Sequence, residues 1–151
     1  MGKEMRGEVQ IDGRILEGFT VSDGAEFPSS RQMAREQTIV FEDYVIGLQI
    51  LAALALEASG ESALQYNLVF ASNLSVADLG LYYASDVALE SHIKEAICRK
   101  IQYEIGGSSP FVAFWDEKSK LPVYTVFPAN NTELFLDAFF GEEPLSRYRS
   151  N

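Results

Sequence analysis

The single histidine and the single cysteine of this chain are its most direct candidates for nucleophilic or metal chemistry. A catalytic triad needs a base beside its nucleophile, and histidine is the usual base. We expect a helix over residues 86–105, on which His92 and Cys98 are six residues apart. Six residues correspond to about 240° around a helix, so the two side chains are expected on different faces. We therefore predict no catalytic residues of this kind. A structural zinc site, which needs several such ligands, and an internal disulfide are likewise not expected.

Two further motifs could position a nucleophile or an anion. Ser91-His-Ile-Lys94 has the Ser-x-x-Lys spacing of penicillin-binding nucleophiles, but the companion Lys-Thr-Gly and Ser-Asp-Asn motifs are missing. The segment Gly106-Gly-Ser-Ser-Pro110 could hold an anion through its backbone amides. Because it precedes a predicted strand and not a helix, we interpret it as a turn. No cofactor-binding motif accompanies either segment.

Adjacent carboxylates could bind a hard cation such as Mg²⁺. Three such pairs occur, at Glu42–Asp43, Asp116–Glu117 and Glu142–Glu143. Neighbouring side chains on one element point apart, and no pair has the spacing of a calcium-binding loop. We interpret the first pair as a helix N-terminus, which favours negative charge, and the other two as solvated loops. A glycosidase-type pair that assembles only in three dimensions stays open as an alternative.

The acidic residues show a more unusual pattern, because residues 36–93 contain eight of them and no lysine or arginine. This stretch holds most of the net charge of −10, which arises from 22 acidic and 12 basic residues. We predict that it forms a surface for a basic partner protein. The residues assigned to this surface are Glu42, Asp43, Glu57, Glu61, Asp78, Asp86 and Glu90. The alternative is that this part is mostly core, with acids that only solubilise its ends.

The same negative charge argues against two classes of partner. Phosphate backbones and anionic membrane surfaces both repel an acidic protein, so we expect no direct nucleic-acid binding and no membrane binding. The segment from Met1 to Arg6 lacks the apolar core of a signal peptide. We therefore expect a cytoplasmic protein.

The first half of the chain predicts two strands, a loop, a strand and a helix. Asp12-Gly13 suits the tight turn of a hairpin over residues 8–21, and residues 22–30 indicate a loop. Residues 38–41 could form a short strand. From Val45 to Leu56 the only polar residue is Gln49, which predicts a core helix buried on most faces, including Leu51 and Leu54.

The second half predicts a strand over residues 66–70, a helix over residues 86–105, a hairpin over residues 111–127 and a short helix over residues 131–140. Residues 74–84 suit a helix or a strand equally. The apolar stripe of the first helix comprises Leu89, Ile93, Ala96, Ile97 and Ile101. A length of 151 residues is that of one domain, with loose termini at residues 1–7 and 142–151.

These elements predict an α+β fold in one domain, with a largely antiparallel sheet built from two hairpins and a central strand. The sheet is expected to pack against a buried apolar helix and an amphipathic helix. The expected function is that of a non-enzymatic acidic binding or inhibitor protein acting on a basic partner. Small secretion chaperones, toxin-immunity proteins and phage inhibitors share such size and acidity.

Two other functions stay open. One is a small-molecule or nucleotide sensor with a pocket lined by aromatic residues such as Trp115 and Tyr124. The other is a carboxylate-based hydrolase. The apolar residues of the helix over 131–140 also predict a homodimer interface at Leu136 and Phe140, unless the C-terminal tail covers them.

Overall fold

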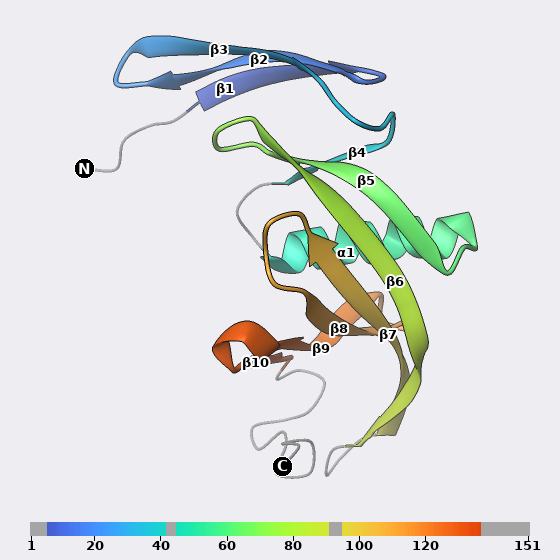
Figure 1. Ribbon diagram of the computed structural model, residues 1–151. Helices are drawn as coiled ribbons and strands as arrows, with labels where there is room; N and C mark the ends of the chain where they lie inside the picture. Colours follow the sequence, from blue (N-terminus) through green and yellow to red (C-terminus); the bar gives the residue numbers. More distant parts are fainter. Residues whose placement is uncertain (1–5, 42–44, 91–94, 137–151) are drawn as a thin grey trace.

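The computed structural model describes residues 6–41, 45–90 and 95–136. Strands hold 64% of these residues, and the described part contains one α-helix. The strands form a three-stranded sheet in the order β1-β2-β3 and a seven-stranded sheet in the order β10-β9-β8-β7-β6-β5-β4 (Figure 1). The predicted mixture of helix and antiparallel-rich sheet is therefore confirmed at this coarse level, whereas the predicted pair of long helices is not.

The small sheet is an antiparallel meander of β1 (Arg6–Asp12), β2 (Ile15–Ser22) and β3 (Ala25–Gln32). The first hairpin is confirmed, and Gly13 takes a positive φ of 55° in its turn. The predicted loop over residues 22–30 is wrong. Asp23 and Gly24 both have positive φ angles, and this two-residue turn returns the chain as β3.

A β-α-β unit follows, and it begins the large sheet. β4 (Thr38–Phe41) and β5 (Ala63–Phe70) are parallel neighbours, joined through α1 (Val45–Ser59). Gly60, with a φ of 69°, lies directly after the helix, where a left-handed residue commonly ends one. The short strand, the helix and the next strand are thus confirmed, with longer bounds for the last two than the sequence predicted.

A long hairpin of β6 (Ser75–Glu90) and β7 (Glu95–Ile105) replaces the predicted helix over residues 86–105. The apolar residues there also follow a period of two: Leu89 and Cys98 are buried, whereas Ile97, counted in the helical stripe, is 69% exposed. Strand pairing along the whole hairpin overrides the local helical pattern. A register shift between Tyr83 and Ser85 marks a bulge, which bends a strand of this length.

The C-terminal part of the sheet is formed by β8 (Phe111–Asp116), β9 (Leu121–Phe127) and β10 (Thr132–Phe135). The hairpin of β8 and β9 is confirmed. The predicted helix over residues 131–140 is wrong where the structure describes it, because Thr132–Phe135 pairs antiparallel with β9. A short 3₁₀ turn (Pro128–Asn130) and the left-handed Asn131 reverse the chain before that strand.

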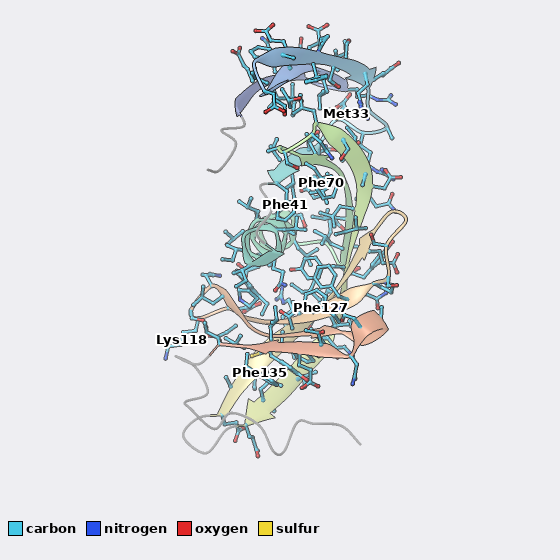
Figure 2. All side chains as sticks on the ribbon, turned by 90° about the vertical axis from the view of Figure 1, so that its left-hand side faces the viewer. Met33, Phe41, Phe70, Lys118, Phe127 and Phe135 are labelled. Carbon is cyan, nitrogen blue, oxygen red and sulfur yellow. The ribbon has the colours of Figure 1, made fainter. Side chains whose placement is uncertain are left out.

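The large sheet curves around α1, which contacts both β4 and β9, near opposite ends of the strand order. The main core lies between the helix and this concave face, where Figure 2 shows Phe41, Phe70 and Phe127. A second core gathers Leu89 and Cys98 of the β6–β7 hairpin with residues of β9. A third core joins the small sheet to the β5–β6 turn.

The prediction that α1 buries Leu51 and Leu54 is wrong. Leu51 is 50% exposed and Leu54 is 39% exposed, although the helix has no charged residue from Val45 to Leu56. The face toward the sheet carries Leu48, Ala52, Ala53, Leu56 and Gln49. The curved sheet encloses one side of the helix and leaves the other side uncovered among the described residues.

Candidate functional site

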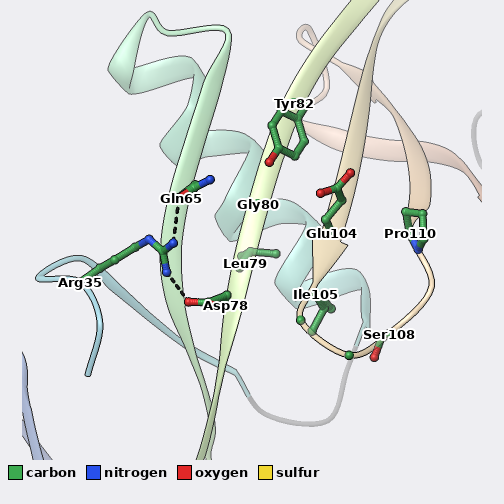
Figure 3. A pocket seen from close by; sticks show the side chains of 12 residues that line it. Arg35, Gln65, Asp78, Leu79, Gly80, Tyr82, Glu104, Ile105, Ser108 and Pro110 are labelled. Carbon is green, nitrogen blue, oxygen red and sulfur yellow. Dashed lines mark hydrogen bonds and ion pairs between the residues drawn. The ribbon is translucent and has the colours of Figure 1, made fainter. Parts of the chain in front are cut away.

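A groove of about 450 Å³ lies on the face of β5, β6 and β7 that points away from α1 (Figure 3). Three segments far apart in the sequence supply its side chains. These are the connection after β3, the strands β5 and β6, and the end of β7 with its following turn. The groove therefore forms only when the connection after β3 lies against the large sheet.

Arg35 is the basic residue of the groove, and a buried amide positions it. The Asn67 side chain, only 1% exposed, accepts a hydrogen bond from Arg35 N at 3.0 Å. Its amide donates to Arg35 O at 2.6 Å. The guanidinium then forms an ion pair with Asp78 and donates to Gln65 Oε1 at 2.8 Å. Both partners come from the strands beneath it, so Arg35 fastens the connection to the sheet.

Gly80 forms the floor of the groove. A methyl group at this position would lie 3.0 Å from the Tyr82 ring, so the glycine leaves the ring room to lie over the strand. Glu104 is the register partner of Gly80, and Gln102 Nε2 donates to Glu104 Oε1 at 2.8 Å. Gly106 N donates to Asp78 O at 2.8 Å, which ties the β7–β8 turn to the rim.

The groove thus presents a guanidinium, two carboxylates and an aromatic ring. Asp78 is already engaged by Arg35, whereas Glu104 forms no ion pair among the described residues. Such a set suits a small polar molecule with hydroxyl or amine donors more than it suits an anion. No group of three potential metal ligands occurs in residues 6–41, 45–90 and 95–136.

A second charged cluster surrounds the C-terminal end of α1. The Glu57 carboxylate accepts hydrogen bonds from Trp115 Nε1 and from Lys120 Nζ, both at 2.7 Å. Burial acts to raise the pKa of Glu57, but the hydrogen bonds from Lys120 and Trp115 outweigh it, so this pKa lies below its ordinary value. The Glu57 carboxylate is therefore part of the structure that holds α1 to the β8–β9 hairpin.

Arg99 links this cluster to β6. It forms an ion pair with Glu117, and its guanidinium carbon lies 4.8 Å from the centroid of the Tyr83 ring. The Tyr83 hydroxyl donates to Asp86 Oδ1 at 2.8 Å, and this hydrogen bond raises the pKa of Tyr83. Asp86 thus belongs to a network that includes the basic residue Arg99, so its carboxylate is less available to a basic partner.

The seven acids predicted to bind a partner are distributed over several places. Glu57 and Asp86 belong to the cluster around Arg99, and Asp78 belongs to the groove. Glu61 is exposed at the connection between α1 and β5, and Glu90 is exposed at the far end of β6. Glu42 and Asp43 lie outside the described residues. The described members therefore form no single patch.

Sequence reasoning missed an acidic face on the small sheet. Glu8, Asp12, Glu17 and Glu26 alternate along the strands so that the pairing register places all four on one side. All four are exposed. The opposite side carries the residues of the third core, so this acidic face points away from the body. The sequence signal for this face is the pair of Asp-Gly turns, Asp12-Gly13 and Asp23-Gly24, because these turns fix the register that places the four acids on one side.

The aromatic residues predicted to line a pocket lie elsewhere. Trp115 is completely buried, and Tyr124 is 5% exposed between the rings of Phe114 and Phe135. Leu136, predicted to lie in a dimer interface, packs against the second core, and Phe140 lies outside the described residues.

The remaining candidate motifs lie partly outside the described residues. Ser91, His92 and Lys94 lie outside the described residues, as do Glu142 and Glu143. Gly106-Gly-Ser-Ser-Pro110 is a turn between strands, as predicted. The Asp116 carboxylate accepts hydrogen bonds from the backbone and the hydroxyl of Ser119.

Comparison with known proteins gives no relative: no protein-family model, curated protein or solved structure matches the chain. Within residues 6–41, 45–90 and 95–136, no helix is long and apolar enough to cross a membrane.

Proposed function

We propose that this protein is a non-enzymatic binding protein whose acidic face on β1, β2 and β3 contacts a basic partner protein. The observation that carries the proposal is the face formed by Glu8, Asp12, Glu17 and Glu26, which points away from the body of the molecule. Four exposed carboxylates on one face attract a cationic surface and raise the association rate.

Apolar residues on the same face add a second kind of contact. The register places Ile15, Phe19 and Pro28 among the carboxylates, and Ile15 is 50% exposed. Protein interfaces commonly combine apolar anchors with a charged rim, because the anchors give affinity and the charges give orientation. A basic protein with an apolar centre in its binding surface is the partner that fits.

The small number of buried residues in the small sheet supports the same proposal. β3 has no buried residue, and β2 has one, Leu16. A sheet with so little buried surface gains modest stability from its own packing. A partner that covers its outer face would supply the contacts that the chain itself does not.

The experiment is photo-crosslinking in the native host. Ser30 lies beside Glu17 in the register, so a benzoylphenylalanine there places the photoreactive group within the acidic face. We expect one predominant crosslinked protein of basic isoelectric point. The same group at Lys118, in the exposed β8–β9 turn, is the position control and should give no such product.

A charge-matched pair of variants makes this test decisive. Glu8→Lys, Glu17→Lys and Glu26→Lys together should abolish the crosslink at position 30. The control triple Glu36→Lys, Glu61→Lys and Glu95→Lys changes the net charge equally at exposed sites elsewhere. Equal loss in both triples would show that only net charge matters, and no loss in either would end the proposal.

A second candidate function is small-molecule binding, favoured by the groove around Gly80. Its position against a short, fastened connection gives it a fixed shape, and Glu104 is free of ion pairs among the described residues. A thermal-shift screen of polar metabolites tests this function. A true ligand should stabilise the wild type and lose its effect in Glu104→Gln, whereas Glu95→Gln should keep it.

A further inference from the structure

The outward face of α1 is apolar from Ile46 to Ala58. Ile46 is 56% exposed, Leu51 is 50% exposed and Leu54 is 39% exposed. The only polar residue between Val45 and Leu56 is Gln49, which is 1% exposed and points toward the sheet, where its Oε1 accepts a hydrogen bond from Thr125. The helix therefore has its polar residue inside and its apolar residues outside, which is the reverse of a solvated helix.

Four residues on this outward face have the spacing of a helix-packing seam. Gly47, Leu51, Leu54 and Ala58 are separated by four, three and four residues. This is the alternation of d and a positions in heptads, which keeps side chains on one side of a helix so that they face a second helix. Three of the four are exposed and Gly47 is partly so, so the described residues leave the seam open to a partner.

The seam is symmetric about the midpoint of the helix. If an identical helix packs antiparallel, Leu51 meets Leu54 of the second copy, and Gly47 meets Ala58 of the second copy. Each such layer joins an a position to a d position, as antiparallel helix pairs require. The two large residues meet in the centre and the small residues meet at the ends. A two-fold axis through the middle of α1 therefore pairs all four residues of the seam with residues of the second copy, as in a self-complementary interface.

Gly47 supports this arrangement independently. A glycine inside a helix costs about 1 kcal/mol relative to alanine. Apart from its chain neighbours and its own helix backbone, no described residue lies within 4 Å of the position that a Cβ of Gly47 would occupy, so packing among the described residues gives no reason for the glycine. A closely approaching second helix does give one, because the missing side chain lets two helix backbones come near each other.

Charge identifies the occupant. The protein has a net charge of −10, so two copies repel each other wherever acidic surfaces meet. Between Val45 and Leu56, α1 carries no charge, and neither its first nor its last turn contains a basic residue. A basic partner would gain no ion pair from the stretch between Val45 and Leu56, whereas the central layers of a second copy can pack against this stretch without opposing like charges.

We propose that two copies of this chain associate through α1, packed antiparallel along Gly47, Leu51, Leu54 and Ala58. In Figure 2 the helix is seen almost end-on at the left-hand side of the molecule, where a second copy would dock. This surface is separate from the acidic face on the small sheet, so the dimer can bind its basic partner at two places.

Sedimentation equilibrium between about 1 and 500 μM tests the proposal, since a small interface of this kind gives micromolar affinity. We expect the wild type to pass from monomer to dimer in this range. Leu51→Glu with Leu54→Glu places like charges in both central layers and should remain monomeric. Circular dichroism should be unchanged, because both side chains are exposed.

The double variant Leu51→Glu with Leu54→Lys is the matched control. In an antiparallel pair each glutamate meets a lysine, so this variant should still dimerise, whereas a parallel pair would oppose identical charges. Ile97→Glu, at a 69% exposed site away from α1, should leave the dimer intact. A monomeric wild type at 500 μM would overturn the proposal, and this is also the outcome expected if the chain's own C-terminal segment covers the seam. A dimeric Glu/Glu variant or a monomeric Glu/Lys variant would overturn it as well.

Discussion

At the scale of single residues, Glu57 lies where the dipole of α1 disfavours it. The C-terminal end of a helix carries partial negative charge, so a carboxylate there is destabilised unless cations or donors stand near it. Lys120 and the indole of the buried Trp115 supply both. The contact therefore connects the end of the helix to β8 and to the β8–β9 turn, and it makes Glu57 a stabilising residue and not a free binding residue.

The first prediction concerns the pH dependence of this contact. Because the pKa of Glu57 is lowered from its ordinary value of 4.5, its carboxylate stabilises the folded state above that value. This stabilisation is lost as the pH falls through the lowered pKa. Glu57→Gln should cost about 1 kcal/mol at pH 7, and the difference from the wild type should shrink toward zero in strong acid.

Urea unfolding followed by Trp115 fluorescence measures this difference, since Trp115 is the only tryptophan. Glu61→Gln is the control, because Glu61 is exposed at the connection just after the helix. It should change the midpoint little at either pH. A Glu57→Gln deficit that stays constant from pH 7 to pH 3 would contradict the assignment.

The second prediction concerns Gly18 in the middle of β2. A methyl group at this position would overlap the carbonyl oxygen of Glu8 and lie 3.0 Å from the Cα of Val9. Backbone atoms cannot move aside as a side chain can, so Gly18→Ala should separate β1 from β2. Hydrogen exchange of β1 should accelerate strongly, while β6 remains protected. Gly47→Ala should cause no such loosening, because no described residue outside its own helix lies within 4 Å of the added methyl group.

At the scale of elements, the first hairpin turn and the core helix could be predicted, but the long hairpin could not. Asp12-Gly13 correctly marked the first hairpin, and Asp23-Gly24 has the same dipeptide. The second turn was missed because Gly24 and Pro28 made residues 22–30 resemble a loop. The strand after this turn, β3, is exposed on both faces, so it has no apolar alternation that a sequence could reveal.

The helix prediction over residues 86–105 failed for a different reason. The apolar residues of that segment satisfy both a period of 3.6 and, in each half, a period of two. The choice between helix and strand depends on a partner strand, and the two halves of the segment are partners of each other, with Leu89 opposite Ala96 and Val87 opposite Cys98. A local pattern cannot reveal that pairing.

The third prediction follows from the corrected orientation of α1. Leu48 is 2% exposed in the main core, whereas Leu51 is 50% exposed. Leu48→Ala should lower the free energy of unfolding by about 2–5 kcal/mol, because it removes buried apolar volume. Leu51→Ala should change it by less than about 1 kcal/mol at submicromolar concentration, where a weak dimer is dissociated. Equal losses in the two variants would place Leu51 in the core after all.

At the scale of the whole molecule, the groove depends on how segments far apart in the sequence meet. The groove needs Arg35 from the connection, Asp78 from β6 and Glu104 from β7, and no spacing in the sequence brings these together. The acidic stretch over residues 36–93 was a correct observation of composition. Its acids are nevertheless spread over the molecule because a strand of 16 residues, β6, carries three of them far apart.

The last prediction concerns the stability of the small sheet relative to the rest. It is joined to the body by a small core in which Leu16 and Met33 are the buried residues from its side, whereas β5, β6 and β7 enclose the main core. Elements with little buried apolar surface open at lower free energy than the global unfolding transition. Backbone amides of β2 should therefore exchange with deuterium at least about ten times faster than those of the main-core part of β6.

Leu16→Ala sharpens this prediction. Leu16 is completely buried and belongs to the third core, so its truncation should accelerate exchange in β1, β2 and β3 together. Exchange near Leu81 of β6, which packs in the main core, should remain unchanged, because separate cores open in separate cooperative units. The basic partner should reverse the effect by protecting the small sheet, since a ligand of the folded state suppresses local opening. Exchange that accelerates equally in both sheets would mean that they unfold as one unit, and the acidic face would then be part of the rigid body.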